Sequence, residues 1–181
     1  MYKNFINKMN NFLKSFKLEI FPLSLILVLA FSRLIPHPPN FTPIIAVAVM
    51  SGYLFKNIYI SLIVLSLSML VSDLIIGFYS NYFLVYFSLI LIVFIFSKIN
   101  KDINTKNLFL YAVFSSSIFF IITNFGVWAL GGLYEKNLTG LISCYLLAIP
   151  FFTNTILSTI FYSYTVFFLY NLIKKKKLVN L

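Results

Sequence analysis

The sequence is poor in the residues on which most enzymes and disulfide-rich domains depend. Its 181 residues include four acidic side chains, one histidine (His37) and one cysteine (Cys144). A single cysteine excludes an intrachain disulfide and a zinc site built from cysteines. The sequence also contains no Gly-x-Ser-x-Gly motif and no Walker-type phosphate loop. We therefore expect no enzymatic activity, no cofactor and no metal site.

Charge is scarce as well, at 10% of the residues, whereas 61% are hydrophobic and 19% aromatic. Soluble domains are typically about 25% charged, so water could not solvate the surface of this chain. A net charge of +10 would favour nucleic-acid binding in a soluble protein. Here the lysines lie at the ends of apolar runs, where they indicate membrane topology instead. The sequence predicts an all-α integral membrane protein whose main partner is the lipid bilayer, with no nucleic-acid partner.

Three parts of the chain differ in composition. Residues 1–17 are basic, with apolar residues at helical spacing, and form either a helix on an anionic membrane surface or a frayed tail. Residues 18–173 form a membrane domain of about six helices, and residues 174–181 form a basic tail. The predicted spans are 18–35, 41–55, 58–78, 82–97, 108–130 and 151–173.

Two of the apolar segments are too short to cross a membrane, which takes about 20 residues. The span 41–55 follows three prolines that end the preceding helix, and we expect it to be thinned, irregular or buried against its neighbours. Residues 131–140 are predicted to be a loop, and residues 141–149 to be a short re-entrant or interfacial segment.

The distribution of lysines predicts that both termini are cytoplasmic. With the N-terminus inside, twelve Lys and Arg residues lie in inner segments and two, Arg33 and Lys136, lie in outer segments. Positive residues are enriched on the cytoplasmic side of membrane proteins, and an odd number of spans would place the lysines at 174–177 outside. We expect a multi-pass protein of the bacterial inner membrane.

Under this topology, the polar residues that orientation does not explain gather near the outer face. Asp73 is the most informative, because a carboxylate within a span costs roughly 2.5–3.5 kcal/mol on insertion scales. Arg33 lies at a similar depth and is its expected partner. Two interpretations remain open: the pair fixes helix packing, or Asp73 lines a ligand cavity. The candidate substrate-binding residues are Arg33, His37, Asn40, Asp73, Asn124, Trp128 and Asn154.

Several of these candidates have an equally simple structural explanation. His37 lies among prolines in a stiff segment, which is either a lid or a connector facing water. Trp128 suits the aromatic belt at a membrane boundary. Asn124 lies within a span and needs a hydrogen-bond partner, which comes from either a neighbouring helix or a ligand. The same holds for Asn154.

Four segments together resemble an uncharacterised family of bacterial membrane proteins assigned to transport: RLIPHPPNFTP (33–43), SDLIIGF (72–78), TNFGVW (123–128) and PFFTNT (150–155). The likeness covers roughly residues 18–172. That family is similar in layout to the substrate-binding (S) components of energy-coupling-factor (ECF) vitamin transporters. The resemblance implies six helices and a ligand beneath the outer loops 36–40, 79–81 and 131–140.

The resemblance further implies a substrate-capture subunit for a small micronutrient, working with an energising transmembrane subunit and separate ATPases. One departure concerns docking, because many S components carry an Ala-x-x-x-Ala pair in their first helix, and Ser24–Leu29 has none. The alternative function is a structural or assembly membrane protein that transports nothing.

Overall fold

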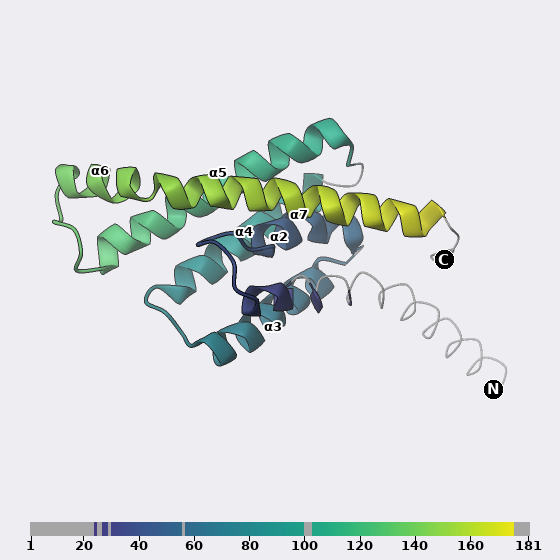
Figure 1. Ribbon diagram of the computed structural model, residues 1–181, viewed down its shortest axis with the longest axis horizontal. Coiled ribbons are helices and arrows are strands. Elements are labelled where there is room, and N and C mark those ends of the chain that lie inside the picture. Colours follow the sequence, from purple (N-terminus) through teal and green to yellow (C-terminus); the bar gives the residue numbers. More distant parts are fainter. Residues whose placement is uncertain (1–23, 25–26, 29, 56, 100–102, 176–181) are drawn as a thin grey trace.

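The computed structural model describes residues 24, 27–28, 30–55, 57–99 and 103–175. Regular secondary structure in this part of the chain is all helical, as predicted, and consists of one short 3₁₀ helix and six α-helices (Figure 1). They are η1 (Ser32–Leu34), α2 (Ile44–Leu54), α3 (Ile58–Ile76), α4 (Tyr82–Ile99), α5 (Thr105–Leu130), α6 (Leu138–Leu147) and α7 (Ile149–Lys175).

Four of these helices are long and apolar enough to cross a membrane: α3, α4, α5 and residues Ile149–Leu172 of α7. They coincide with four of the predicted spans. Large apolar side chains cover their surfaces; Ile63 and Leu74 on α3, for example, are 57% and 66% exposed. Soluble monomers rarely expose apolar surface on this scale, and lipid is its natural solvent. The four helices indicate a multi-pass membrane protein.

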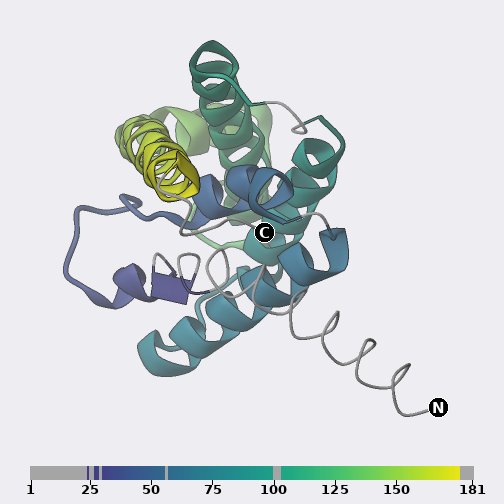
Figure 2. The ribbon, with the colours of Figure 1, turned by 90° about the vertical axis from the view of Figure 1, so that its right-hand side faces the viewer.

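The short helix α2 lies at the centre of the molecule and packs against α3, α4, α5 and α7 (Figure 2). Nine of its eleven residues are buried. It is short because Pro43 precedes its first turn and the backbone becomes extended at Phe55. The sequence predicts that the segment 41–55 is thinned, irregular or buried against its neighbours, and the structure shows it buried. The core of the protein is thus an apolar helix surrounded by longer ones.

Small residues allow these helices to approach closely, as is common in membrane proteins. Gly52 of α2 faces the backbone of α4, where an added Cβ atom would lie 2.6 Å from the Cα atom of Ser97. Between α5 and α7, the Ser116 hydroxyl donates a hydrogen bond to Thr159 Oγ1 at 3.1 Å. Contacts of this kind fix the spacing of α2 against α4 and of α5 against α7.

Much of the predicted first span, the basic segment 1–17 and residues 176–181 of the basic tail lie outside the described residues. The helix boundaries near α6 differ from the prediction. The loop expected to reach Gly140 ends at Asn137, whose side chain accepts a hydrogen bond from the Gly140 amide and caps the helix. Asn is a favoured N-cap residue. α6 then leads into α7, which has Pro150 in its first turn, where no amide donor is needed.

Candidate functional site

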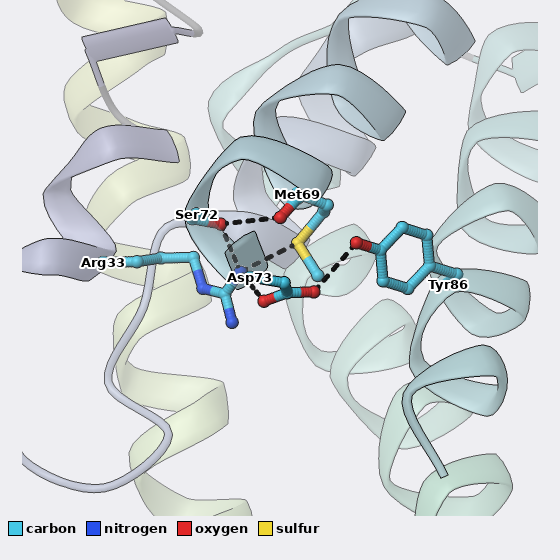
Figure 3. Close-up of polar contacts among 5 residues, drawn as sticks. All are labelled: Arg33, Met69, Ser72, Asp73 and Tyr86. Atoms are coloured by element: carbon cyan, nitrogen blue, oxygen red, sulfur yellow. Dashed lines mark hydrogen bonds and ion pairs between the residues drawn. The ribbon is translucent and has the colours of Figure 1, made fainter. Parts of the chain in front are cut away.

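A buried ion pair joins η1 to α3 near one end of the helices. Arg33 Nη1 lies 2.8 Å from Asp73 Oδ1. The same nitrogen donates to Ser72 Oγ at 2.6 Å and approaches Met69 Sδ at 3.4 Å. Tyr86 of α4 donates its hydroxyl to Asp73 Oδ2 at 2.8 Å, from the opposite side of the carboxylate (Figure 3). The predicted partnership of Arg33 and Asp73 is confirmed.

The local sequence explains this arrangement. Met69 and Ser72 precede Asp73 by four and one residues, so one turn of α3 presents the groups that contact Arg33. Gly77, with φ of 99°, then ends α3 in a conformation that side chains disfavour, and the chain turns toward Tyr79. Asp73 is fully buried, whereas the Arg33 side chain is 11% exposed. The carboxylate therefore holds Arg33 in place without facing solvent itself.

Arg33 lines a cavity of about 380 Å³. This volume is at the small end of the range for ligand pockets, which is roughly 300–1,000 Å³. The walls come from η1, α2, α4, α5, α7 and two connecting loops. The lining residues are Arg33, Asn40, Thr42, Ile44, Ile45, Tyr79, Val85, Phe119, Phe120, Thr123, Asn124, Val127, Phe151, Thr155 and Ser158.

A second cavity, of about 550 Å³, adjoins the first, because Arg33, Asn40 and Thr42 line both. Its other walls are the proline-rich loop and the end of α3, at Ile75 and Ile76. Asn40 has a positive φ of 60°, which Asn tolerates better than most residues. The loop thus places a short amide side chain at the junction of the two cavities.

Tyr79, in the loop between α3 and α4, adds a hydroxyl to the wall of the smaller cavity. The pKa of Tyr79 is raised to about 12, mainly by burial and secondly by the negative charge of Asp73, although the charge of Arg33 lowers it. The hydroxyl therefore remains protonated at physiological pH and is available as a hydrogen-bond donor.

The predicted site residues fall into two groups. Arg33, Asn40 and Asn124 line the smaller cavity. His37 lines only the second one, and its Nδ1 lies 3.0 Å from the carbonyl oxygen of Pro38. Asp73 lines neither cavity among the described residues. Asn124 Nδ2 donates to the carbonyl of Phe120 at 2.8 Å, so its hydrogen-bond partner lies on its own helix and not on a neighbouring one.

Trp128 and Asn154 have structural contacts and line neither cavity within the described chain. Trp128 Nε1 donates to the carbonyl of Glu135, and Lys136 contacts the carbonyls of Trp128 and Gly131, closing the loop after α5. Asn154 Nδ2 donates to the carbonyl of Pro39 at 2.9 Å and ties the proline-rich loop to α7. Trp128 thus stabilises the loop after α5, and Asn154 stabilises the proline-rich loop that lines the second cavity.

Sequence reasoning missed most of the cavity wall. Thr42 and Thr123 were not predicted, although both belong to segments that carried the family resemblance, and Tyr79 was predicted only as part of a loop above the ligand. The aromatic wall could not be singled out, because the chain has 22 Phe and 12 Tyr residues. Among the residues that the structure describes, no three His, Cys, Asp or Glu side chains gather as a metal site would require.

The chain matches a known family model over most of its length. A family model with the description "Family of unknown function" matches residues 14–181. No curated protein and no solved structure matches the chain.

Proposed function

This chain belongs to that family of unknown function, DUF6580, and we propose that it captures a small water-soluble micronutrient in the cavity beside Arg33, as the substrate-binding subunit of a membrane transport system. The observation that carries the proposal is the cavity itself, which combines an arginine, two asparagines and several hydroxyls with an apolar wall. Ligand sites are typically apolar pockets with a few convergent polar groups.

The burial of charge beside this cavity supports a binding role. A guanidinium and a carboxylate within a membrane domain are tolerated when they pair or face a wet cavity, and they commonly mark substrate pathways. Asp73 is paired on both oxygens, while Arg33 is paired and also faces the cavity. A purely structural pair needs no cavity beside it.

The orientation that we propose places this cavity at the outer face. The cavity lies at the end of α4 opposite to Lys98, and Lys106 begins α5 at that same far end. With the lysine-rich ends in the cytoplasm, both termini are cytoplasmic and the cavity opens outward. A ligand would then enter from the periplasmic side of a bacterial inner membrane.

An S-component-like layout fits this proposal. In such a system, the capture subunit binds the micronutrient, and an energising transmembrane subunit with separate ATPases drives its release. The sequence itself has no ATP-binding motif, so any ATP hydrolysis would belong to those partners. The missing Ala-x-x-x-Ala pair implies a different docking surface on the partner.

The alternative is a structural or assembly protein of the membrane, and the full burial of Asp73 favours it. Asp73 is 0% exposed, and both of its oxygens have protein partners. In that case, replacing Asp73 would destabilise the fold, and filling the cavity would have no effect on any bound molecule.

Mass spectrometry of small molecules that co-purify with the gently solubilised protein tests the proposal. We expect a compound in the wild type that is lost in Thr123→Trp, which fills the cavity from α5. Ile121→Trp is the matched control, because Ile121 lies on the same helix, is 56% exposed and does not line the cavity. A wild type that carries no compound, or a compound retained by a folded Thr123→Trp variant, would argue for the structural alternative.

A further inference from the structure

The charges around the smaller cavity identify the class of molecule that it accepts. We infer that the ligand is a small carboxylic acid, bound as a monoanion with its carboxylate against Arg33 and an apolar body against the phenylalanine wall. The inference rests on the proposed function and adds the chemical class of the substrate. Among the described residues, Arg33 is the one cationic residue that lines this cavity, and no acidic residue lines it.

The ion pair is oriented so that its positive end faces the cavity. Asp73 is fully buried behind Arg33, and its second oxygen accepts a hydrogen bond from Tyr86 on the side away from the guanidinium (Figure 3). Ser72 Oγ accepts from the same Nη1 nitrogen as Asp73 does. Ser72 and Asp73 on α3 therefore fix the guanidinium at the cavity wall, and Tyr86 on α4 holds Asp73 in turn. An arginine held in this way presents a planar array of donors that matches the geometry of a carboxylate.

The donors near Arg33 suit an anion as well. Tyr79 contributes a hydroxyl that stays protonated, and Asn40 and Thr42 contribute an amide and a hydroxyl to the same part of the wall. Each of these groups can donate a hydrogen bond to an acceptor oxygen. A primary amine or quaternary ammonium ligand would instead meet a fixed positive charge.

One partly neutralised guanidinium suits one negative charge. A phosphate monoester carries between one and two charges at neutral pH and is usually bound by several cations or backbone amides. No lysine lines the cavity among the described residues, and Asp73 already neutralises part of the Arg33 charge. A carboxylate therefore fits this site better than a phosphate.

The rest of the cavity favours an elongated, partly apolar body. Phe119, Phe120 and Phe151 form an apolar wall together with Ile44 and Ile45. The lining positions of α5 run from Phe119 to Val127, which at 1.5 Å per residue is about 12 Å. Thr155 and Ser158 add hydroxyls on the opposite helix, α7, but each donates its proton to a carbonyl of that helix. These hydroxyl oxygens can accept hydrogen bonds from a ligand.

Equilibrium dialysis of the purified full-length protein tests the inference directly. The probe is a defined equimolar mixture of small monocarboxylic acids, their neutral amides, phosphate monoesters and primary amines, and the bound fraction is measured by mass spectrometry. We expect the acids to be enriched over their matched amides by roughly tenfold or more, as a charge-assisted hydrogen bond provides. Enrichment of amides, phosphates or amines over the acids would overturn the inference and leave a binding function in place. Enrichment of nothing would overturn the proposed function, and the inference with it.

Variants assign the preference to Arg33. Arg33→Gln alone leaves Asp73 charged and unpaired, so the variant that tests the inference is Arg33→Gln combined with Asp73→Asn, which removes both charges. It should lose the preference for acids over amides, whereas Asp73→Asn alone should keep that preference because the guanidinium remains. Lys98→Gln is the charge-matched control, since Lys98 is exposed and does not line the cavity. A folded double variant that still prefers acids would overturn the role of Arg33.

Discussion

At the scale of single residues, Asp73 determines where the charge of Arg33 points. Its two oxygens contact groups from different elements, Arg33 in η1 and Tyr86 on α4, and the side chain is 0% exposed. A buried ion pair of this kind contributes little net stability. Removing one partner is strongly destabilising, however, because it leaves the other charge buried and uncompensated. The pair therefore acts as a positioning device for a group that faces the cavity.

Tyr86→Phe should destabilise the protein by about 1.5–3 kcal/mol, because the buried, charged carboxylate of Asp73 loses the hydrogen bond that Tyr86 donates to it. The free energy of unfolding, measured in detergent by denaturant titration, checks this. Tyr59→Phe is the control, because Tyr59 is 72% exposed. Equal stability of both variants would contradict the role assigned to Tyr86.

Tyr79 should make stability depend on pH in the alkaline range. Its pKa is raised to about 12 from an ordinary value of 10.0, so the folded protein holds this proton more tightly than the unfolded chain does. The stabilisation is complete below pH 10 and is lost as the pH rises toward 12. The unfolding midpoint of the wild type should therefore fall more steeply over this interval than that of Tyr79→Phe. Parallel pH profiles would contradict the assignment.

At the scale of elements, the close contact between α2 and α4 fixes the centre of the molecule. Gly52 leaves room for the α4 backbone at Ser97. The α4 atoms nearest to Gly52 all belong to the backbone, so they could not move aside as a flexible side chain could. The position of α2 in turn sets Ile44 and Ile45 in the cavity wall. The shape of the cavity thus depends on a residue that does not line it.

Gly52→Ala should cost about 1–3 kcal/mol through overpacking, of which better helix propensity returns at most about 1 kcal/mol. Gly132→Ala is the matched control, because an added Cβ atom at Gly132 meets nothing within 4 Å. Its stability should stay within about 0.5 kcal/mol of the wild type. Thermal unfolding in detergent compares the two. A neutral Gly52→Ala would mean that the two helices can separate without cost.

The sequence predicted the features that rest on rare residues. With four acidic residues and one arginine in the chain, the partner of Asp73 was easy to identify. The short second span was predicted to begin at residue 41, three residues before α2 begins at Ile44. The phenylalanines of the cavity could not be predicted individually, because aromatic residues occur throughout the chain and their burial depends on tertiary packing. The start of α6 was predicted wrongly because residues 131–140 contain three glycines and were assigned to a loop, although Asn137 within them caps the helix.

At the scale of the whole molecule, the orientation in the membrane decides which side the cavity serves. The loop after α5 lies at the same end as the cavity wall at Val127, and Lys98 and Lys106 lie at the other end of α4 and α5. The distribution of lysines predicts that the lysine-rich end is cytoplasmic.

Cysteine labelling checks this orientation. In a background with Cys144→Ser, which removes the natural thiol, Gly132→Cys should react with a membrane-impermeant maleimide in intact cells. Lys106→Cys should react only after the membrane is permeabilised. The reverse pattern would place the cavity at the cytoplasmic face and would rule out capture from outside.

The order of the ion-pair residues along the chain has a consequence for biosynthesis. Arg33 precedes Asp73 by 40 residues, and Tyr86 follows Asp73 by 13. Chains are made from the N-terminus, so the guanidinium is already at the membrane when the segment with the carboxylate leaves the ribosome. The penalty of roughly 2.5–3.5 kcal/mol for inserting an acidic span is then offset as soon as that span meets its partner. Tyr86 arrives last, with the following helix, and completes a contact that the nascent chain has already begun.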